Sequence, residues 1–257
     1  MGEYAGVSGN LPEMEGGWDE LFDESYTLLY APSFSEERTR AEAEAAARLA
    51  EVPAGAEILD CPCGFARHAL VLAGAGYRVT GADRSQVQLA EATQRREAAE
   101  WPRLVRADYR ELPFPDASFD AVLCLFTSLG YLDRAGDVGV LSEFRRVLRP
   151  GGPLIVETMH RDRLARIFQP RGWDTHPDGG LILRERELDF VAGTVSNHQL
   201  YIPVEGERVS RRFVVCVYTV TEWVAMMREA GFAEVEAFGG WEAASPSHDT
   251  RLVLRAR

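Results

Sequence analysis

Three aspartates in the first half of the chain each follow a short apolar run of the kind that forms a β-strand. Asp60, Asp83 and Asp108 occur in the segments ILDCPCG, VTGADRS and RADYRELPF. Carboxylates at the carboxyl ends of successive parallel strands meet along one edge of a sheet, where open α/β sheets bind their ligands. Because ionised carboxylates accept hydrogen bonds, the three together predict a site for a ligand that carries hydroxyl and amino groups.

The loop after Asp60 carries a single glycine, Gly64. A dinucleotide fingerprint G-x-G-x-x-G would place Pro62 and Arg67 at its outer glycine positions, and an arginine there prevents close packing of helix on strand. Asp60 would also repel a pyrophosphate. S-adenosylmethionine fits better, because Asp60 can receive its ammonium group, directly or through water, while Gly64 lets the loop backbone approach the ligand closely.

The other two acids complete the same ligand. Asp83 can accept hydrogen bonds from both ribose hydroxyls. Asp108 can accept from the adenine 6-amino group, with Tyr109 beside the base. A single aspartate at the end of a strand is more often a helix cap or a turn former, so the prediction rests on three acids that end three consecutive strands.

Strand and helix patterns alternate between Ile58 and Glu157, which predicts a doubly wound, mostly parallel sheet. Ser33 and Ser85 are expected N-caps of two helices, with Glu36 and Gln88 in capping-box positions.

The pattern changes in the second half of the chain. Three long strands between Leu181 and Thr219, joined by short glycine turns, predict an antiparallel insertion. A helix over Thr221–Ala230 and two further strands follow. We therefore expect four parts: a helical cap segment, an α/β core that binds the cofactor, an insertion that forms a lid or a dimer surface, and a C-terminal completion of the core. Their expected bounds are 1–52, 53–165, 166–220 and 221–257.

The core motifs resemble those of the class I S-adenosylmethionine-dependent methyltransferases over roughly residues 58–157. The matching segments are ILDCPCG, VTGADRS, RADYRELPF, FDAVLCLFTSLGY and FRRVLRPGGPLIVE. The loop of that family usually reads D-x-G-x-G-x-G, and here Pro62 and Ala66 replace its outer glycines. The resemblance implies a Rossmann-like, seven-stranded, mostly parallel sheet and S-adenosylmethionine as cofactor.

A looser resemblance links the chain to the sugar-amine N-methyltransferases. They share the N-terminal helical segment with its tyrosines, the FTSLGY stretch and a late antiparallel insertion. By that similarity Tyr26 approaches the methionyl part of the cofactor and Tyr131 faces the acceptor. The matching core segments add Cys61, Arg84 and Leu125 to the expected cofactor neighbours.

Methyl transfer from a sulfonium is a direct displacement, so alignment and desolvation can carry most of the catalysis. If the acceptor must lose a proton, His160, just past the fifth strand, is a candidate base. The alternative is a surface histidine in a loop. Tyr131 either orients an acceptor or packs, and Trp173 either lines an acceptor pocket or covers a sheet.

The composition limits the remaining choices. The net charge of -12 argues against a nucleic-acid partner and favours a neutral or cationic small-molecule acceptor, methylated on nitrogen or oxygen, with nitrogen ahead. All 28 basic residues are arginine, which excludes lysine Schiff-base chemistry. The four cysteines lack the spacing of zinc ligands. We find neither a membrane span nor a signal peptide pattern, so we expect a cytoplasmic protein.

Two other functions remain open at this point. A nicotinamide-dependent oxidoreductase can use a similar sheet, and binding of NADH in place of S-adenosylhomocysteine would favour it. A non-catalytic protein could retain the fold as a binding module, and the altered loop is the main observation in its favour.

Overall fold

The computed structural model describes residues 21–96 and 100–257. The helical cap segment expected over 1–52 therefore begins outside the described residues. Within the described part, α2 spans Glu24–Tyr30 and a short 3-10 helix, η1, follows over Ala31–Ser33.

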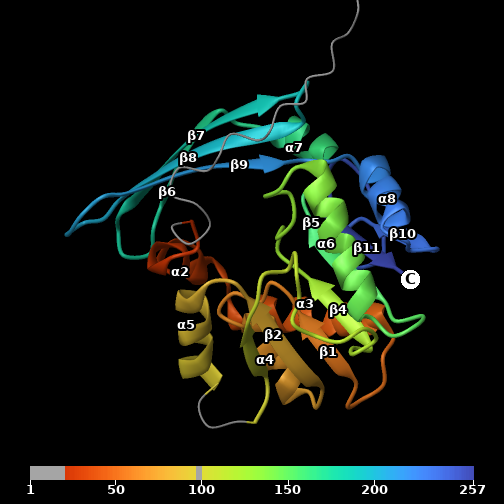
Figure 1. Cartoon of the computed structure of the whole chain (residues 1–257). Helices are drawn as coiled ribbons and strands as arrows, with labels where there is room; N and C mark the ends of the chain where they lie inside the picture. The colour runs from red at the N-terminus through yellow and green to blue at the C-terminus, as the bar shows by residue number, and fades with distance from the viewer. Residues whose placement is uncertain (1–20, 97–99) are drawn as a thin grey trace, which may run out of the picture.

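The alternating apolar runs form a seven-stranded sheet, in which β11 alone runs antiparallel to both of its neighbours (Figure 1). The order across the sheet is β3-β2-β1-β4-β5-β11-β10, which confirms the predicted doubly wound core. The strands are β1 (Glu57–Asp60), β2 (Arg78–Asp83), β3 (Arg103–Arg106), β4 (Ala121–Cys124), β5 (Leu154–Thr158), β10 (Val235–Phe238) and β11 (Leu252–Ala256).

Helices cover both faces of this sheet. One face packs on α3 (Glu36–Ala50), α4 (Arg67–Gly74) and α5 (Gln86–Arg96), and the other on α6 (Arg134–Val147) and α8 (Val220–Glu229). Small alanines of α3 and α4 allow close approach on the first face, whereas Phe144 and Trp223 fill the second. Full burial of each such large side chain contributes about 1.5–3 kcal/mol.

The two predicted helix caps had different outcomes. Ser35, and not Ser33, is the N-cap of α3: its hydroxyl accepts from the Arg38 N–H, because Ser33 is already part of η1. Ser85 does accept from the Gln88 N–H at 3.2 Å, as predicted. The Gln88 side chain does not return to Ser85, however, and turns to α2 instead.

The insertion is a four-stranded antiparallel sheet in the order β6-β7-β8-β9. Three of its strands were predicted, namely β7 (Leu181–Asp189), β8 (Thr194–Ile202) and β9 (Val209–Cys216), and β6 (Arg171–Thr175) was missed. Proline and glycine flank β6, so its sequence reads as a turn. The helix α7 (Arg161–Ile167) leads from β5 into this sheet.

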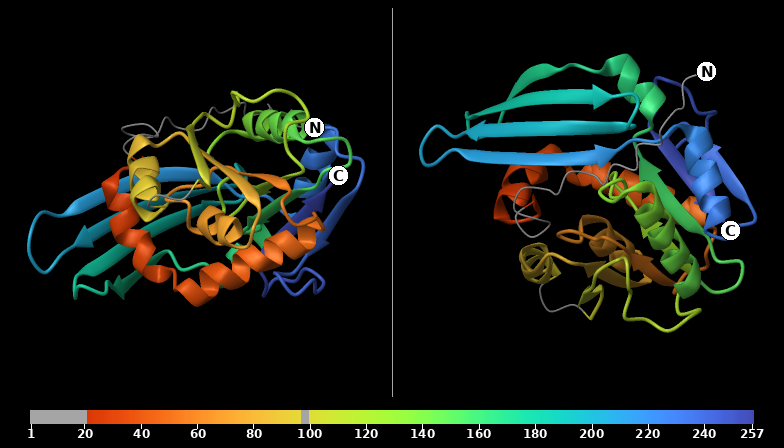
Figure 2. Two further views of the ribbon diagram at one scale, coloured as in Figure 1. Left: turned by 90° about the horizontal axis from the view of Figure 1, so that it is seen from below. Right: turned by 45° about the horizontal axis from the view of Figure 1, so that its top comes forward.

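This second sheet lies over α2 and extends beyond the core on one side (Figure 2). Ile182 and Tyr201 pack on Leu29 of α2, and Val195 and Val217 pack on Leu164 of α7. None of the helices in the described ranges is both long and apolar enough to span a membrane.

Candidate active site

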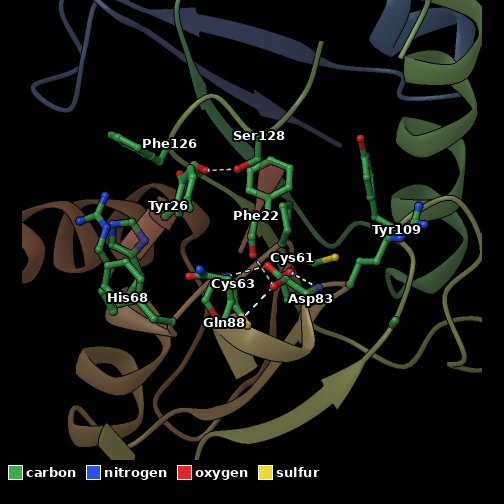
Figure 3. A pocket seen from close by; sticks show the side chains of 18 of the residues that line it. Phe22, Tyr26, Cys61, Cys63, His68, Asp83, Gln88, Tyr109, Phe126 and Ser128 are labelled. Atoms are coloured by element: carbon green, nitrogen blue, oxygen red, sulfur yellow. Dashed lines mark hydrogen bonds between the residues drawn. The ribbon is translucent and has the colours of Figure 1, made fainter. Parts of the chain in front are cut away.

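A pocket opens at the carboxyl ends of β1, β2, β3 and β4, beneath α2. Figure 3 shows Phe22, Tyr26 and Phe126 on one side of it and Asp83 and Gln88 on the opposite side. It is lined by Phe22, Tyr26, Phe34, Cys61–Arg67 except Ala66, His68, Asp83, Arg84, Ser85, Gln88, Ala107–Arg110, Leu125–Ser128 and Tyr131. The structure thus brings together most of the residues that the sequence singled out.

Asp83 organises the floor of the pocket. One carboxylate oxygen accepts from the Gly64 N–H at 2.7 Å and the other from the Ser85 N–H at 2.8 Å. Gly64 has a φ of +54° and points its Cβ position into open space, with only Gln88 Oε1 near, at 3.9 Å. The Arg84 N–H also approaches this carboxylate, and the lone pairs that remain can accept from a ligand hydroxyl while Asp83 holds the loop.

Asp60 provides the clearest test of whether a cationic ligand fits. Asp60 is not among the residues that line the pocket, but it directly precedes Cys61, which is. Its side chain is buried, and within the described residues its Oδ2 atom has no hydrogen-bond partner. The pKa of Asp60 is raised to about 7: burial is the main cause, the Arg67 guanidinium opposes the rise and the Asp83 carboxylate adds to it. An ammonium group would stabilise a buried carboxylate that has one oxygen atom without a partner, so the residues present fit the methionyl end of S-adenosylmethionine.

Asp108 lies at the pocket but already has partners. Arg110 donates to both of its oxygens, at 3.0 and 2.6 Å, and Arg84 lies 3.4 Å from one of them. The hydrogen bonds from Arg110 hold the pKa of Asp108 below its usual value. The carboxylate therefore stays ionised, and it would share its remaining lone pairs with an adenine amino group.

Three other predicted neighbours form the buried part of the wall. Cys61 and Leu125 extend the apolar surface at the ends of β1 and β4, and Tyr109 closes one end of the pocket (Figure 3). Burial raises the pKa of the Cys61 thiol well above its usual value. This cysteine is therefore a neutral packing group and not a nucleophile.

Tyr26 and Tyr131 enter the pocket from different parts of the chain and meet at Phe22. The Phe22 ring centroid lies 5.2 Å from that of Tyr26 and 5.5 Å from that of Tyr131. Burial is the main cause that raises the pKa of both phenols. Both side chains are therefore neutral near pH 7, where they can donate a hydrogen bond but cannot act as phenolate bases.

The junction between core and insertion fixes Tyr131. Asp137, fully buried, accepts from the Gly130 N–H at 3.1 Å and from the Tyr218 hydroxyl at 2.7 Å. The Cys216 N–H donates to the Gly130 carbonyl at 2.7 Å. The end of β9 and the loop that carries Tyr131 are thus held together around one buried acid.

Sequence reasoning missed several residues of the pocket, of which Gln88 is the clearest. Its side-chain amide donates to the Asp23 carbonyl and the Thr27 hydroxyl, and the Ser85 hydroxyl donates to the Phe22 carbonyl. These bonds fix α2 over the pocket. The capping-box position of Gln88 explained this residue as a local cap, so the sequence carried no separate signal for its second role.

A strained turn after β4 forms another part of the wall that the sequence did not reveal. Phe126 and Thr127 both adopt left-handed conformations, with φ of 63° and 54°. Such backbone costs of order 1 kcal/mol or more per residue and persists where the surroundings impose it. The Glu157 carboxylate accepts from the Phe126 N–H at 2.9 Å, and Arg251, paired with Glu157, donates to Thr127. The turn directs Phe126 against Phe34, with ring centroids 4.7 Å apart.

His160 does not reach the pocket. It is the N-cap of α7, its Nδ1 accepts from the Arg163 N–H, and its Nε2 lies 3.1 Å from the carbonyl oxygens of Ser247 and Thr250. Because main-chain groups occupy both ring nitrogens, the prediction of a catalytic base is not supported. Trp173 is 65% exposed on the outer face of the insertion and is not among the residues that line the pocket.

The arrangement is therefore better suited to positioning a ligand than to abstracting a proton from it. His68 lines the pocket, but burial lowers its pKa, and its Nε2 is 3.1 Å from Glu42. Among the described residues no group of three or more histidines, cysteines or acids is placed to hold a metal ion. The site offers two buried acids, Asp60 and Asp83, to a ligand that carries a cation and hydroxyl groups. Beside them lies an aromatic chamber formed by Phe22, Tyr26 and Tyr131.

Known proteins share both the sequence and the fold. A family described as "Methyltransferase domain" matches residues 58–152. The demethylmenaquinone methyltransferase of Thermus thermophilus is 34% identical over 197 residues, 71% of this chain and 78% of that protein. The structure of the CcbJ methyltransferase from Streptomyces caelestis matches with a TM-score of 0.80 and 20% identity, over 93% of this chain and 99% of that one.

A further similar structure is that of CalS10 with bound S-adenosylmethionine, an amino pentose methyltransferase from Micromonospora echinaspora. Its TM-score is 0.69 at 23% identity, over 91% of this chain and 97% of that one. The two structures share the fold, and the Thermus relative extends the sequence match over most of both chains. The chain therefore belongs to the class I S-adenosylmethionine-dependent methyltransferases, and S-adenosylmethionine is its cofactor.

Proposed function

We propose that this methyltransferase transfers the methyl group to a nitrogen, or alternatively an oxygen, of a small molecule that enters beneath the insertion. One observation carries the proposal: Phe22, Tyr26 and Tyr131 form an aromatic chamber between the pocket and the antiparallel sheet. A methyl acceptor must lie where the methionyl end of the cofactor meets open space, and this chamber adjoins that end. The acceptors named for two similar methyltransferases, demethylmenaquinone and an amino pentose, are also small molecules.

For the cofactor we propose roles that follow the geometry. Asp60 takes the ammonium group, Asp83 the two ribose hydroxyls and Asp108 the adenine amino group. Gly64 allows close approach of the loop. Cys61, Arg84, Tyr109 and Leu125 complete the surface around the nucleoside, and Tyr26 closes the methionyl end.

The bound cofactor supplies an electrophilic methyl group on a sulfonium. The residues of the chain then have two tasks, to align an acceptor and to exclude water. Tyr131 stays protonated and can donate a hydrogen bond that orients the acceptor. Since the phenols of the chamber do not ionise near pH 7, an amine acceptor must arrive unprotonated or release its proton to water, so turnover should rise with pH.

The remaining expectations on partners stay proposals. The net charge of -12 supports a small-molecule acceptor over a nucleic acid. The exposed outer face of the insertion is the surface that a homodimer would use. A cytoplasmic location and the absence of a membrane partner are further predictions of this kind.

The proposal is tested by incubating the full chain with S-adenosylmethionine labelled with ¹³C in the methyl group and a panel of small amines, alcohols and phenols. NMR of the product identifies the atom that receives the label, since N-methyl and O-methyl carbons have distinct shifts. We expect label on nitrogen. Label on carbon or sulfur, with the cofactor bound, would contradict the proposed acceptor atom.

A further inference from the structure

The face of the insertion that looks toward the core differs from an ordinary packing face. At one end Ile182 and Tyr201 pack on α2, and at the other Val195 packs near α7. Between these two apolar anchors the same face carries Gln199 and, opposite it on β9, Arg211. We call this central stretch the polar band. Apolar contacts at both ends hold the sheet in place, so packing does not require polar residues between them.

Arg211 is the exceptional member of the polar band. It is 6% exposed, and within the described residues its Nε and Nη1 atoms are buried without any hydrogen-bond partner. The other two arginines of this face have oxygen partners. Arg184 pairs with Asp174, and Arg186 donates to the Gln169 carbonyl at 2.9 Å.

The guanidinium of Arg211 lies against the aromatic chamber. Its central carbon is 5.4 Å from the Tyr26 ring centroid and 5.9 Å from that of Tyr30. It is also close enough to Tyr131 to oppose the rise in pKa that burial causes there. On the same strand, Phe213 places its ring centroid 6.5 Å from that of Tyr131. Arg211 thus lies close to Tyr26 and Tyr131, the two tyrosines that line the pocket.

Contact with two aromatic rings offsets only part of the cost of burying this charge. A cation over an aromatic ring gains about 0.5–2 kcal/mol. Removal of an ion from water costs several kcal/mol unless hydrogen bonds and an opposite charge compensate. No carboxylate of the described chain is paired with Arg211, so the missing partner would have to come from a ligand.

We infer that Arg211 binds an oxyanion, a carboxylate or a phosphate, of the methyl acceptor. The inference deepens the proposed function and rests on it, because it assumes that the acceptor enters beneath the insertion. The site then contacts both ends of its substrate. The cofactor side holds the nucleophilic atom near the methyl group, and the polar band binds an anionic group. The acceptor is accordingly anionic in part, against the expectation from the net charge of the chain.

The carboxylate of the cofactor itself is the other possible source of an oxyanion. Arg211 is not among the residues that line the cofactor pocket; its guanidinium packs on the ring of Tyr26, which is, and it extends from β9 of the insertion. This placement favours the acceptor. The two sources differ in a measurable way, since only the second makes cofactor affinity depend on Arg211.

The test uses the full chain saturated with S-adenosylhomocysteine and three probes of similar shape: benzoate, phenyl phosphate and the neutral benzamide. Dissociation constants are measured by ligand-observed NMR for the wild type, Arg211→Met and Arg211→Lys. Arg212→Met is the matched control, because Arg212 is the next residue on β9 and is exposed on the outer face. Thermal unfolding and affinity for S-adenosylhomocysteine are measured for every variant.

We expect at least one anionic probe to bind the wild type about 10-fold or more tightly than benzamide, as hydrogen bonds to a charged group allow. Arg212→Met should keep this preference, Arg211→Met should abolish it, and Arg211→Lys should restore part of it. Equal binding of the anions and benzamide by the wild type, or no anion binding at all, would overturn the inference. An unchanged preference in Arg211→Met would do the same.

A loss of affinity for S-adenosylhomocysteine in a normally folded Arg211→Met protein would assign the residue to the cofactor and also overturn the inference. The binding measurement needs no turnover. Methyl transfer to an unexpected acceptor atom would therefore contradict the proposed function without changing the measured preference for anionic probes.

Discussion

The core and the insertion of this methyltransferase place their polar side chains in different ways. In the core, acids stand at strand ends, and Asp83 is fixed by two backbone N–H groups close to it in the chain or in the adjacent loop. In the insertion, side chains of long paired strands face α2 and the loop that carries Tyr131, and none of the described insertion residues lines the pocket itself. Local chain geometry thus defines the proposed cofactor half of the site, and tertiary packing defines the proposed acceptor half.

The two regions also differ in charge. The core places carboxylates where we propose that the cofactor binds, and burial raises the pKa of both Asp60 and Asp83. The polar band presents the uncompensated guanidinium of Arg211. An acidic protein can therefore contain a basic acceptor site, because net charge describes the surface as a whole and not the local field at one site.

The largest effect is expected at the junction of the two regions. A Cβ on Gly130 would lie 2.5 Å from the Cys216 carbonyl oxygen, and its φ is +100°. Gly130→Ala should therefore lower the free energy of unfolding by about 3 kcal/mol or more, measured by urea denaturation. Gly139→Ala is the control: its Cβ meets nothing within 4 Å and it lies within α6, so it should stabilise the protein by about 0.5–1 kcal/mol.

A large effect is also expected on the cofactor side. Asp83→Ala removes the acceptor of two backbone N–H groups and of the proposed ribose contact. Affinity for S-adenosylhomocysteine should fall about 30-fold by calorimetry, from hydrogen bonds to a charged group worth about 2 kcal/mol. Asp116→Ala, an exposed acid of the core, should leave the affinity unchanged. Unchanged affinity in Asp83→Ala would place the ribose elsewhere.

Asp60 should make cofactor binding depend on pH. Its pKa is about 7 in the free protein, and a bound ammonium group would lower it, so binding releases a proton below that pH. Affinity for S-adenosylhomocysteine should rise up to about 10-fold per pH unit as the pH approaches 7 and level off above it. Asp60→Asn should flatten this profile; the same profile in variant and wild type would remove Asp60 from the site.

On the acceptor side, Tyr131→Phe removes only a hydroxyl group. If that hydroxyl orients the acceptor, kcat should fall about fivefold, equivalent to one neutral hydrogen bond of about 1 kcal/mol. Affinity for S-adenosylhomocysteine should stay constant. Turnover equal to that of the wild type would leave Tyr131 a packing residue.

The smallest effect is expected at Arg110, which is half exposed. Its pair with Asp108 orients the carboxylate at the adenine end, and an exposed ion pair is worth about 0.2–1 kcal/mol. Arg110→Ala should weaken S-adenosylhomocysteine about two- to threefold in the same calorimetric assay. A tenfold or greater loss would mean that Arg110 contacts the cofactor directly.

Much of the cofactor half could be predicted from the sequence for a physical reason. Each of Asp60, Asp83 and Asp108 follows its own strand, so alternation of strands and helices is enough to align the three side chains at one edge. The sequence also indicated the insertion, because alternating strands and glycine turns are local signals. The strand β6 was not predicted because proline and glycine dominate the sequence around it.

The residues that could not be predicted depend on contacts between distant segments. Gln88 has a local explanation as a cap and gains its second role only when α2 lies above it. Phe126 carries no sign of its left-handed backbone, which Glu157 imposes from β5. Two carbonyl groups near the C-terminus approach the His160 ring, and no pattern near His160 could reveal these contacts.

The most direct test of the division into two halves is a crystal structure of the full chain with S-adenosylhomocysteine. The predicted result places the ribose hydroxyls on Asp83, the ammonium group at Asp60 and the sulfur atom facing the chamber of Phe22, Tyr26 and Tyr131. A ligand that leaves Asp83 without a contact, or whose sulfur atom faces away from the chamber and the insertion, would contradict it.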